Sequence, residues 1–180
     1  HIEGNYIVRI LPADSYEVKA ICGKDIHRIN LVQEDGRLII SEKENDDRYI
    51  QLVIRVRELE EIALGGKVRA KLDGLKEKNL HISLWDSASL EALVTTDSLV
   101  AHLSAYSRLV LTGKSETFEA FLTGTSEVVA EGFPVEKVSI EASDISKVNV
   151  NALQEIQINR SSNSLVDYVG KPQKIFIHQE

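Results

Sequence analysis

The chain has 180 residues, of which 43% are hydrophobic and 27% are charged, and its formal net charge is -7. These values are typical of an ordinary folded domain, and the acidic balance argues against nucleic-acid binding, which needs a clustered positive surface. No apolar run reaches the roughly 18 residues of a transmembrane segment. Cys22 is the only cysteine, so we expect a buried small residue rather than a disulfide or a cysteine-rich metal site.

The chain begins His1-Ile2-Glu3-Gly4 and contains no methionine, so we expect a removed segment, such as a signal peptide, to precede it. Apolar residues alternate with polar ones at 6–10, 16–20 and 52–56, which predicts strands. Residues 12–15 and Asp35-Gly36 supply turns between them. We expect residues 1–58 to form strands and hairpins.

A repeated unit follows in the second half of the chain. It consists of three apolar residues at alternate positions, a corner of small residues and two further alternating apolar residues. Its copies begin, in steps of 19, 19, 20 and 18, at Leu80, Leu99, Phe118, Val138 and Ile156. A short period held this steadily is typical of a solenoid, in which each coil stacks on its neighbour. The sequence therefore predicts an all-β solenoid with coils of 18–20 residues over 59–180, forming a single domain, 1–180, with the N-terminal strands.

Alignment of the coils gives four apolar columns, and alternate side chains of a strand share one face. The first strand of each coil contributes Ile62, Ile82, Ala101, Ala120, Ile140, Ile158 and Ile175, and Leu64, Leu84, Leu103, Leu122, Ala142, Arg160 and Ile177. The second strand contributes Val68, Leu90, Leu109, Val128, Val148 and Val166, and Ala70, Ala92, Leu111, Ala130, Val150 and Tyr168. These columns predict the core. Arg160 and Tyr168 are typical of a coil near an end.

The corners carry a hydroxyl column, in which Ala88 is followed by Ser107, Ser126, Ser146 and Ser164. A hydroxyl at a tight corner bonds backbone groups left unpaired by the bend, or the hydroxyl of the neighbouring coil. A nucleophilic serine would need an adjacent base, and the aligned coils offer no histidine there. We expect a structural role.

The strand-rich lead-in, the segment Leu59-Glu60-Glu61-Ile62-Ala63-Leu64-Gly65-Gly66 and the coils with small corners resemble the DUF2807 family, the head (GIN) domain of autotransporter adhesins. The likeness covers nearly the whole chain. Family corners are Ser-Gly-Gly-Ser-like, which Leu122-Thr123-Gly124-Thr125-Ser126 approaches, whereas Trp85-Asp86-Ser87 and Ala105-Tyr106-Ser107 depart from it. The resemblance implies a right-handed, single-stranded parallel β-helix in the periplasm or at the cell surface of a bacterium. It carries over no catalytic residue.

β-Helices also host polysaccharide hydrolases and lyases, and a hydrolase needs two carboxylates roughly 5–9.5 Å apart. Asp86 and Asp144 share a corner column, but three coil steps of roughly 4.8 Å place them about 14 Å apart. No column contains neighbouring acids for a calcium site, and His81 and His102 lack an evident third ligand for zinc. We expect no catalysis, no cofactor and no metal.

Outward positions of the second strand form a row of Ser89, Arg108, Glu127, Lys147 and Leu165. The alternating charges predict a ladder that supports the register, and exposed pairs of this kind contribute about 0.2–1 kcal/mol each. Glu127 between Arg108 and Lys147 argues against a uronate site at those two cations.

Large aromatic residues that gather at a surface often mark a binding site. Trp85 and Tyr106 occupy the same corner of consecutive coils, one register position apart, and Phe121 points outward beside His102. Polar groups beside them would orient a ligand. The candidate platform consists of Trp85, Tyr106, Phe121, His102 and Asp86. Cover by a loop or by a partner chain are the alternatives for the aromatic residues.

The sequence thus favours a non-catalytic, extracytoplasmic, adhesin-like binding module whose partner is a surface glycan or protein. A polysaccharide-active β-helix enzyme is the first alternative. A scaffold that forms homo-oligomers through its coil ends is the second. The last strand, 174–178, has no following cap, so we expect the N-terminal region or another subunit to cover it.

Overall fold

The computed structural model describes residues 1–21, 23–43 and 48–179, and strands dominate it. The N-terminal strands are β1 (Ile2–Gly4), β2 (Tyr6–Pro12), β3 (Glu17–Ile21), β4 (Ile29–Glu34), β5 (Arg37–Glu42), β6 (Ile50–Val56) and β7 (Glu61–Gly66). They are followed by β8 (Arg69–Leu84), β9 (Ser89–Leu103), β10 (Arg108–Leu122), β11 (Glu127–Ala142), β12 (Lys147–Arg160), β13 (Leu165–Gly170) and β14 (Lys174–Gln179). Between β3 and β4 lies a 3₁₀ helix, η1 (Gly23–Arg28). Within these described ranges no helix is long and apolar enough to cross a membrane. Cys22, predicted to be buried in a strand, lies outside the described residues.

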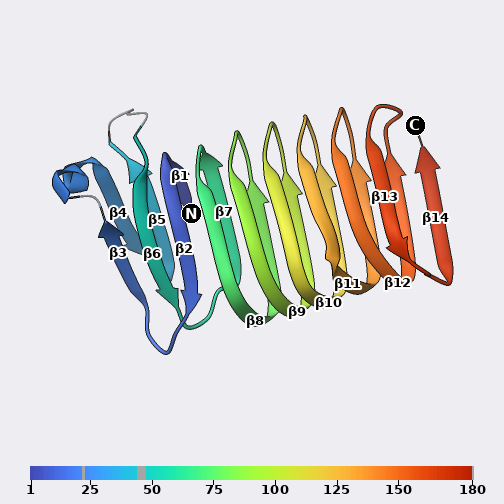
Figure 1. Cartoon of the computed structure of the whole chain (residues 1–180), viewed down its shortest axis with the longest axis horizontal. Coiled ribbons are helices and arrows are strands. Elements are labelled where there is room, and N and C mark those ends of the chain that lie inside the picture. The colour runs from blue at the N-terminus through green and yellow to red at the C-terminus, as the bar shows by residue number, and fades with distance from the viewer. Residues whose placement is uncertain (22, 44–47, 180) are drawn as a thin grey trace.

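Strands β7 to β14 stack as the coils of a β-solenoid (Figure 1). Each long strand bends midway, so that its first half follows one corner and its second half leads to the next; we call these halves the outgoing and returning limbs. Neighbouring strands pair in parallel, and Leu103 pairs with Leu84 on one side and Leu122 on the other. All three are buried. The predicted fold class is confirmed, and the predicted register holds for the central coils. At the two ends it is wrong by two residues: Leu90 pairs with Ala70 rather than with Val68, and Ile175 pairs with Ile156 rather than with Ile158.

The predicted columns form the core from Ile62 to Ile158. Burial fails in the last coil, where Arg160 and Val166 are half-buried and Tyr168, Ile175 and Ile177 are exposed. No further strand of the described chain pairs with β13 or β14, so the side chains of these two strands lack cover, and β14 covers Arg160 only with Gln179. The apolar pattern of this coil therefore follows the repeat without the burial that the earlier coils have.

The corners share one backbone conformation. A residue with a left-handed φ of 57–71° stands at the same place in five successive corners, at Gly66, Asp86, Ala105, Gly124 and Asp144. Two residues later, the buried serine hydroxyl donates to the carbonyl three residues before it, over 2.8, 2.9 and 2.7 Å for Ser107, Ser126 and Ser146. The backbone partner expected for these hydroxyls is thus found, and each bond closes the turn on itself.

The N-terminal strands join the stack out of sequence order. Ile2 of β1 pairs with Leu64 of β7 on one side and with Ile40 of β5 on the other. In the same way β2 lies between β6 and β8, in parallel with both. Residues 2–12 thus form a coil inserted between the coil of β5 and β6 and the coil of β7 and β8 (Figure 1). Parallel pairing therefore extends into the N-terminal strands, where the sequence shows no repeat.

Antiparallel strands close the N-terminal end of the stack. Strand β3 pairs with β6, and β4 pairs with β5 across a hairpin whose turn is Asp35-Gly36, as the sequence predicted. Beneath this cap the Arg28 guanidinium donates to Glu42 over 2.7 Å, with side-chain exposures of 1% and 8%. The other carboxylate oxygen of Glu42 accepts the Asn5 backbone N–H over 2.9 Å. Glu42 therefore links the cap to the inserted coil.

The C-terminal end is open by contrast. Strand β14 pairs with β12, and every residue of β14 is exposed, including Phe176 at 54%. The N-terminal region lies at the opposite end of the stack (Figure 1). The expectation that this region covers the last strand is therefore wrong, because the intervening coils separate the two ends. Cover by another subunit stays a prediction.

Candidate functional site

Trp85 is half-buried at the first corner of the regular coils and leans toward the N-terminal coils. Its ring lies directly over Gly65 of the preceding coil, where an added Cβ would lie 2.2 Å from the indole. The His1 ring packs against it in a tilted arrangement, with ring centroids 5.2 Å apart. Trp85 thus fills a gap that a glycine leaves open, and its partial cover comes from the N-terminal strand.

Tyr106 is 73% exposed and is not level with Trp85. The backbone N–H of Ser104 donates to Leu84, and that of Tyr106 donates to Asp86, over 3.0 and 2.7 Å. Ser104 is therefore the residue level with Trp85, and Tyr106 stands two positions further along, beyond the left-handed corner residue. The predicted offset of one position is wrong, because the step between these coils is 19 residues on both sides of the corner, which aligns Tyr106 with Ser87. The two rings do not form one strip.

His102 and Phe121 meet on the returning limbs of neighbouring coils. They are register partners, and their rings stack with centroids 4.7 Å apart and planes 8° apart. His102 is exposed and Phe121 half-buried. Ser83 and Glu141 are the next residues in the same outward row. The two rings therefore face each other across the row, which continues with a hydroxyl on one side and a carboxylate on the other.

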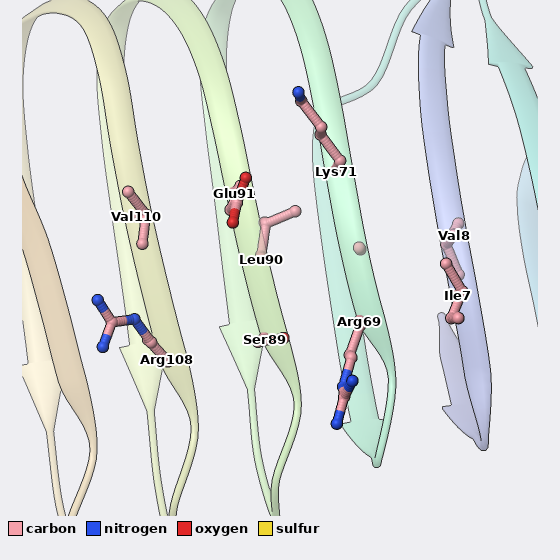
Figure 2. Close-up of a pocket in the computed structure, with 10 residues that line it drawn as sticks. Ile7, Val8, Arg69, Lys71, Ser89, Leu90, Glu91, Arg108 and Val110 are labelled. Atoms are coloured by element: carbon pink, nitrogen blue, oxygen red, sulfur yellow. The ribbon is translucent and has the colours of Figure 1, made fainter. Parts of the chain in front are cut away.

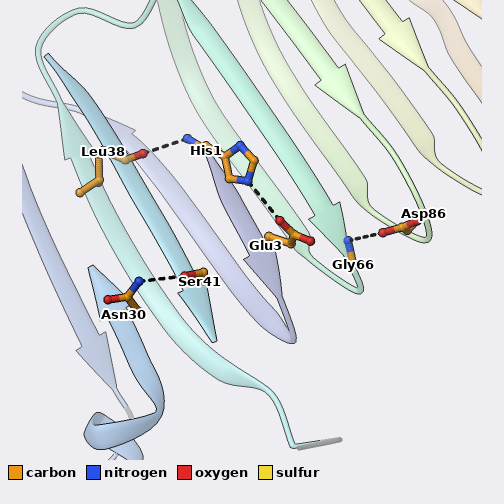
Figure 3. A network of polar contacts seen from close by, with 7 residues as sticks. All are labelled: His1, Glu3, Asn30, Leu38, Ser41, Gly66 and Asp86. Carbon is orange, nitrogen blue, oxygen red and sulfur yellow. Dashed lines mark hydrogen bonds and ion pairs between the residues drawn. The ribbon is translucent and has the colours of Figure 1, made fainter. Parts of the chain in front are cut away.

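Asp86 and Asp144 serve the corners themselves. One carboxylate oxygen of Asp86 accepts the backbone N–H of Gly66 over 3.2 Å (Figure 3), and Asp144 does the same for Gly124 over 2.8 Å. Each aspartate adopts the left-handed conformation and bonds the residue at the same place in the preceding coil. Sequence reasoning missed this role. The signal was the presence of Gly and Asp in one column, since these residues tolerate left-handed backbone better than most.

No group of three or more His, Cys, Asp or Glu side chains within the described ranges could hold a metal ion. The charged row of the outgoing limbs is present as a ladder, in which Arg108 forms an ion pair with its register partner Glu127. The Arg108 and Glu127 side chains are 51% and 33% exposed. Because the pair joins adjacent coils in register, it fits the supporting role expected from the sequence.

The fold and the candidate site define a parallel β-solenoid whose corner polar groups mostly support the corners and whose aromatic groups lie on regular strand surfaces. The chain belongs to the family DUF2807, described as "Putative auto-transporter adhesin, head GIN domain", whose model matches residues 3–172. The resemblance seen in the sequence is thus confirmed. No curated protein matches the chain.

Solved structures share the fold. One described as a "putative adhesin" from Bacteroides fragilis has a TM-score of 0.88 at 15% identity, over 99% of this chain and 87% of its own. A "putative lipid binding protein" from Parabacteroides distasonis gives 0.76 at 17% identity, over 99% and 88%. A "putative adhesin" from Parabacteroides merdae gives 0.66 at 13% identity, over 99% and 85%. At these identities the likeness establishes the architecture alone.

Proposed function

We propose that this protein is a non-catalytic, adhesin-type binding module that acts outside the cytoplasm and contacts glycans. Membership of an adhesin-head family supports the adhesin type and the location. A stack of coils offers a long, rigid surface on which binding groups repeat at the spacing of the strands, about 4.8 Å. Such a surface suits repetitive polymers.

The stacked pair of His102 and Phe121 carries the glycan proposal. A sugar presents an apolar face of C–H groups and a rim of hydroxyls, so its site combines a flat apolar surface with polar groups beside it. The outer faces and edges of the two stacked rings supply the first, and Ser83 and Glu141 in the same row supply the second. We place Tyr106 at the edge of this site, around the corner from His102, as an exposed ring that extends the contact.

Trp85 and Asp86 take supporting roles in this proposal. The indole packs against Gly65 and His1, and the Asp86 carboxylate accepts the Gly66 N–H. Both groups fix the shape of the corner that precedes β9, the strand that carries His102 and leads to Tyr106. Their substitution is expected to lower stability more than it lowers intrinsic affinity.

A glycan array followed by calorimetric titration of the hits tests the proposal. Phe121→Ala and Tyr106→Ala should each weaken binding by about tenfold, since a lost ring contact costs roughly 0.5–1.5 kcal/mol beyond its area. Tyr16→Ala is the matched control, because Tyr16 is 66% exposed at the N-terminal end of the stack. Absence of any glycan hit, or equal losses in all three variants, would refute the glycan site.

The open C-terminal end favours a second candidate, assembly of two copies through β14. Strand β14 has one paired edge and exposes Ile175, Phe176 and Ile177 at 48%, 54% and 58%. Natural proteins cover such edges, and a twofold axis at this end would pair like with like. Sedimentation should show a dimer that Phe176→Asp dissociates. A wild-type chain that stays monomeric at high micromolar concentration would refute this candidate.

A further inference from the structure

A basic groove crosses the outgoing limbs, away from the His102–Phe121 pair, over β2, β8, β9 and β10 (Figure 2). Its volume is about 320 Å³, in the lower range for ligand sites. Arg69, Lys71 and Arg108 bring three positive charges to it, and Glu91 brings one negative charge. The chain as a whole carries a net charge of -7. The residues that line the groove therefore sum to a net positive charge in a chain that is acidic as a whole.

The groove exists because a serine stands between two arginines. Arg69, Ser89 and Arg108 are register partners on three successive strands. At a strand spacing of about 4.8 Å, the Arg69 and Arg108 backbones lie about 10 Å apart. The short Ser89 side chain leaves the space between the two guanidinium groups open. On the outer side of Arg69, Ile7 continues the row and is 43% exposed.

Arg69 is held in position without being neutralised. Its guanidinium lies 5.1 Å from the centre of the Tyr49 ring, and it makes no ion pair with any carboxylate of the described chain. The two other cations differ, since Arg108 pairs with Glu127 and Lys71 lies 3.7 Å from Asp73. A cation that stacks on an aromatic ring keeps its N–H donors for a partner in its plane. Arg69 is thus ready to bind an anion.

We propose that this groove binds a uronic acid unit of an acidic polysaccharide, with its carboxylate on Arg69. The planar guanidinium matches a carboxylate in a bidentate geometry. The Ser89 hydroxyl adds a donor beside it, and Glu91 accepts from sugar hydroxyls. Lys71 and Arg108 already pair with carboxylates and add only a weaker attraction for the negative charge. Ile7 and Val110 give the sugar ring apolar contacts at the two ends of the groove. This site lies on different limbs from the aromatic pair and does not depend on glycan binding there.

The test is titration of the intact chain with oligogalacturonate, with neutral galactan oligomers of equal length, with a sulfated glycan and with anionic phospholipid vesicles. We expect binding to oligogalacturonate that weakens as salt rises. Arg69→Gln should reduce the affinity by about tenfold or more, as expected for a charged hydrogen bond of roughly 1.5–3 kcal/mol. Ser89→Leu, which fills the groove and keeps every charge, should reduce it as well. Lys147→Gln removes an exposed cation from the same row outside the groove and should leave affinity within about twofold.

Several outcomes would overturn the proposal: equal affinity for neutral galactan, binding to vesicles or the sulfated glycan alone, no binding at all, or wild-type affinity in both groove variants. Melting curves accompany each variant. If Arg69→Gln unfolds, Ser89→Leu and Arg108→Gln decide the question. Loss of oligogalacturonate binding in these variants with intact binding in Phe121→Ala would separate this site from the aromatic one.

Discussion

Leu103→Ala tests the stacked core most directly. Leu103 is 2% exposed and lies between Leu84 and Leu122 in adjacent coils. The substitution removes about three carbon groups, worth roughly 0.8 kcal/mol each in transfer free energy. Rigid coils above and below limit collapse into the cavity, which brings the expected loss of unfolding free energy to about 3–5 kcal/mol.

The matched control is Leu93→Ala in the same strand, β9. Leu93 is 49% exposed and points away from the core, so the same chemical change should cost less than about 0.5 kcal/mol. Urea unfolding followed by circular dichroism gives both values, provided that the slope of free energy against urea is unchanged. Equal losses in the two variants would refute the stacking of Leu84, Leu103 and Leu122.

Two further substitutions test the backbone and the cap. Gly113 has φ of +109°, and an added Cβ would lie 1.8 Å from the Val94 carbonyl oxygen, so Gly113→Ala should lower unfolding free energy by about 2 kcal/mol or more. Gly132→Ala, where the nearest atom is 3.5 Å away, should be tolerated in the same urea titration, and similar losses in both would contradict the argument. Glu42→Gln removes the carboxylate that accepts from both the Arg28 guanidinium and the Asn5 backbone N–H and should cost about 3 kcal/mol. Hydrogen exchange should show faster opening of β4 and β5, and unchanged exchange there would count against the role assigned to the pair.

Sequence periodicity was enough to predict the regular coils, because each core position is occupied by one residue per coil and an inward polar residue is costly there. Arg160 is the one charged residue in an inward column, and it lies in the last coil, where the inward positions are no longer fully buried. The serine column was equally informative, since its hydrogen bond is local to the corner. The inward-facing residues could therefore be identified from the sequence wherever coils that are neighbours in space are also neighbours in the chain.

The directions of exposed side chains could not be read in this way. Trp85 leans as it does because Gly65 has no side chain, and that contact depends on the neighbouring coil. Tyr106 follows a left-handed residue, Ala105, whose type gives no sign of that conformation. The basic groove depends on Ser89 being short between two arginines and on Tyr49, which comes from a different part of the chain. Contacts of this kind are absent from any single repeat.

The position of residues 2–12 within the stack bears on how the protein is made and how it can be cut. These residues precede both of their neighbours in the chain, since the strands on either side of them follow later, at 37–56 and 61–72. Residues 2–12 therefore stay unpaired until the strands on both sides of them have been synthesised. Most repeat arrays tolerate the loss of a terminal unit, because only an outer layer is removed. Here removal of the first twelve residues would take out an inner layer and disconnect the cap from the array.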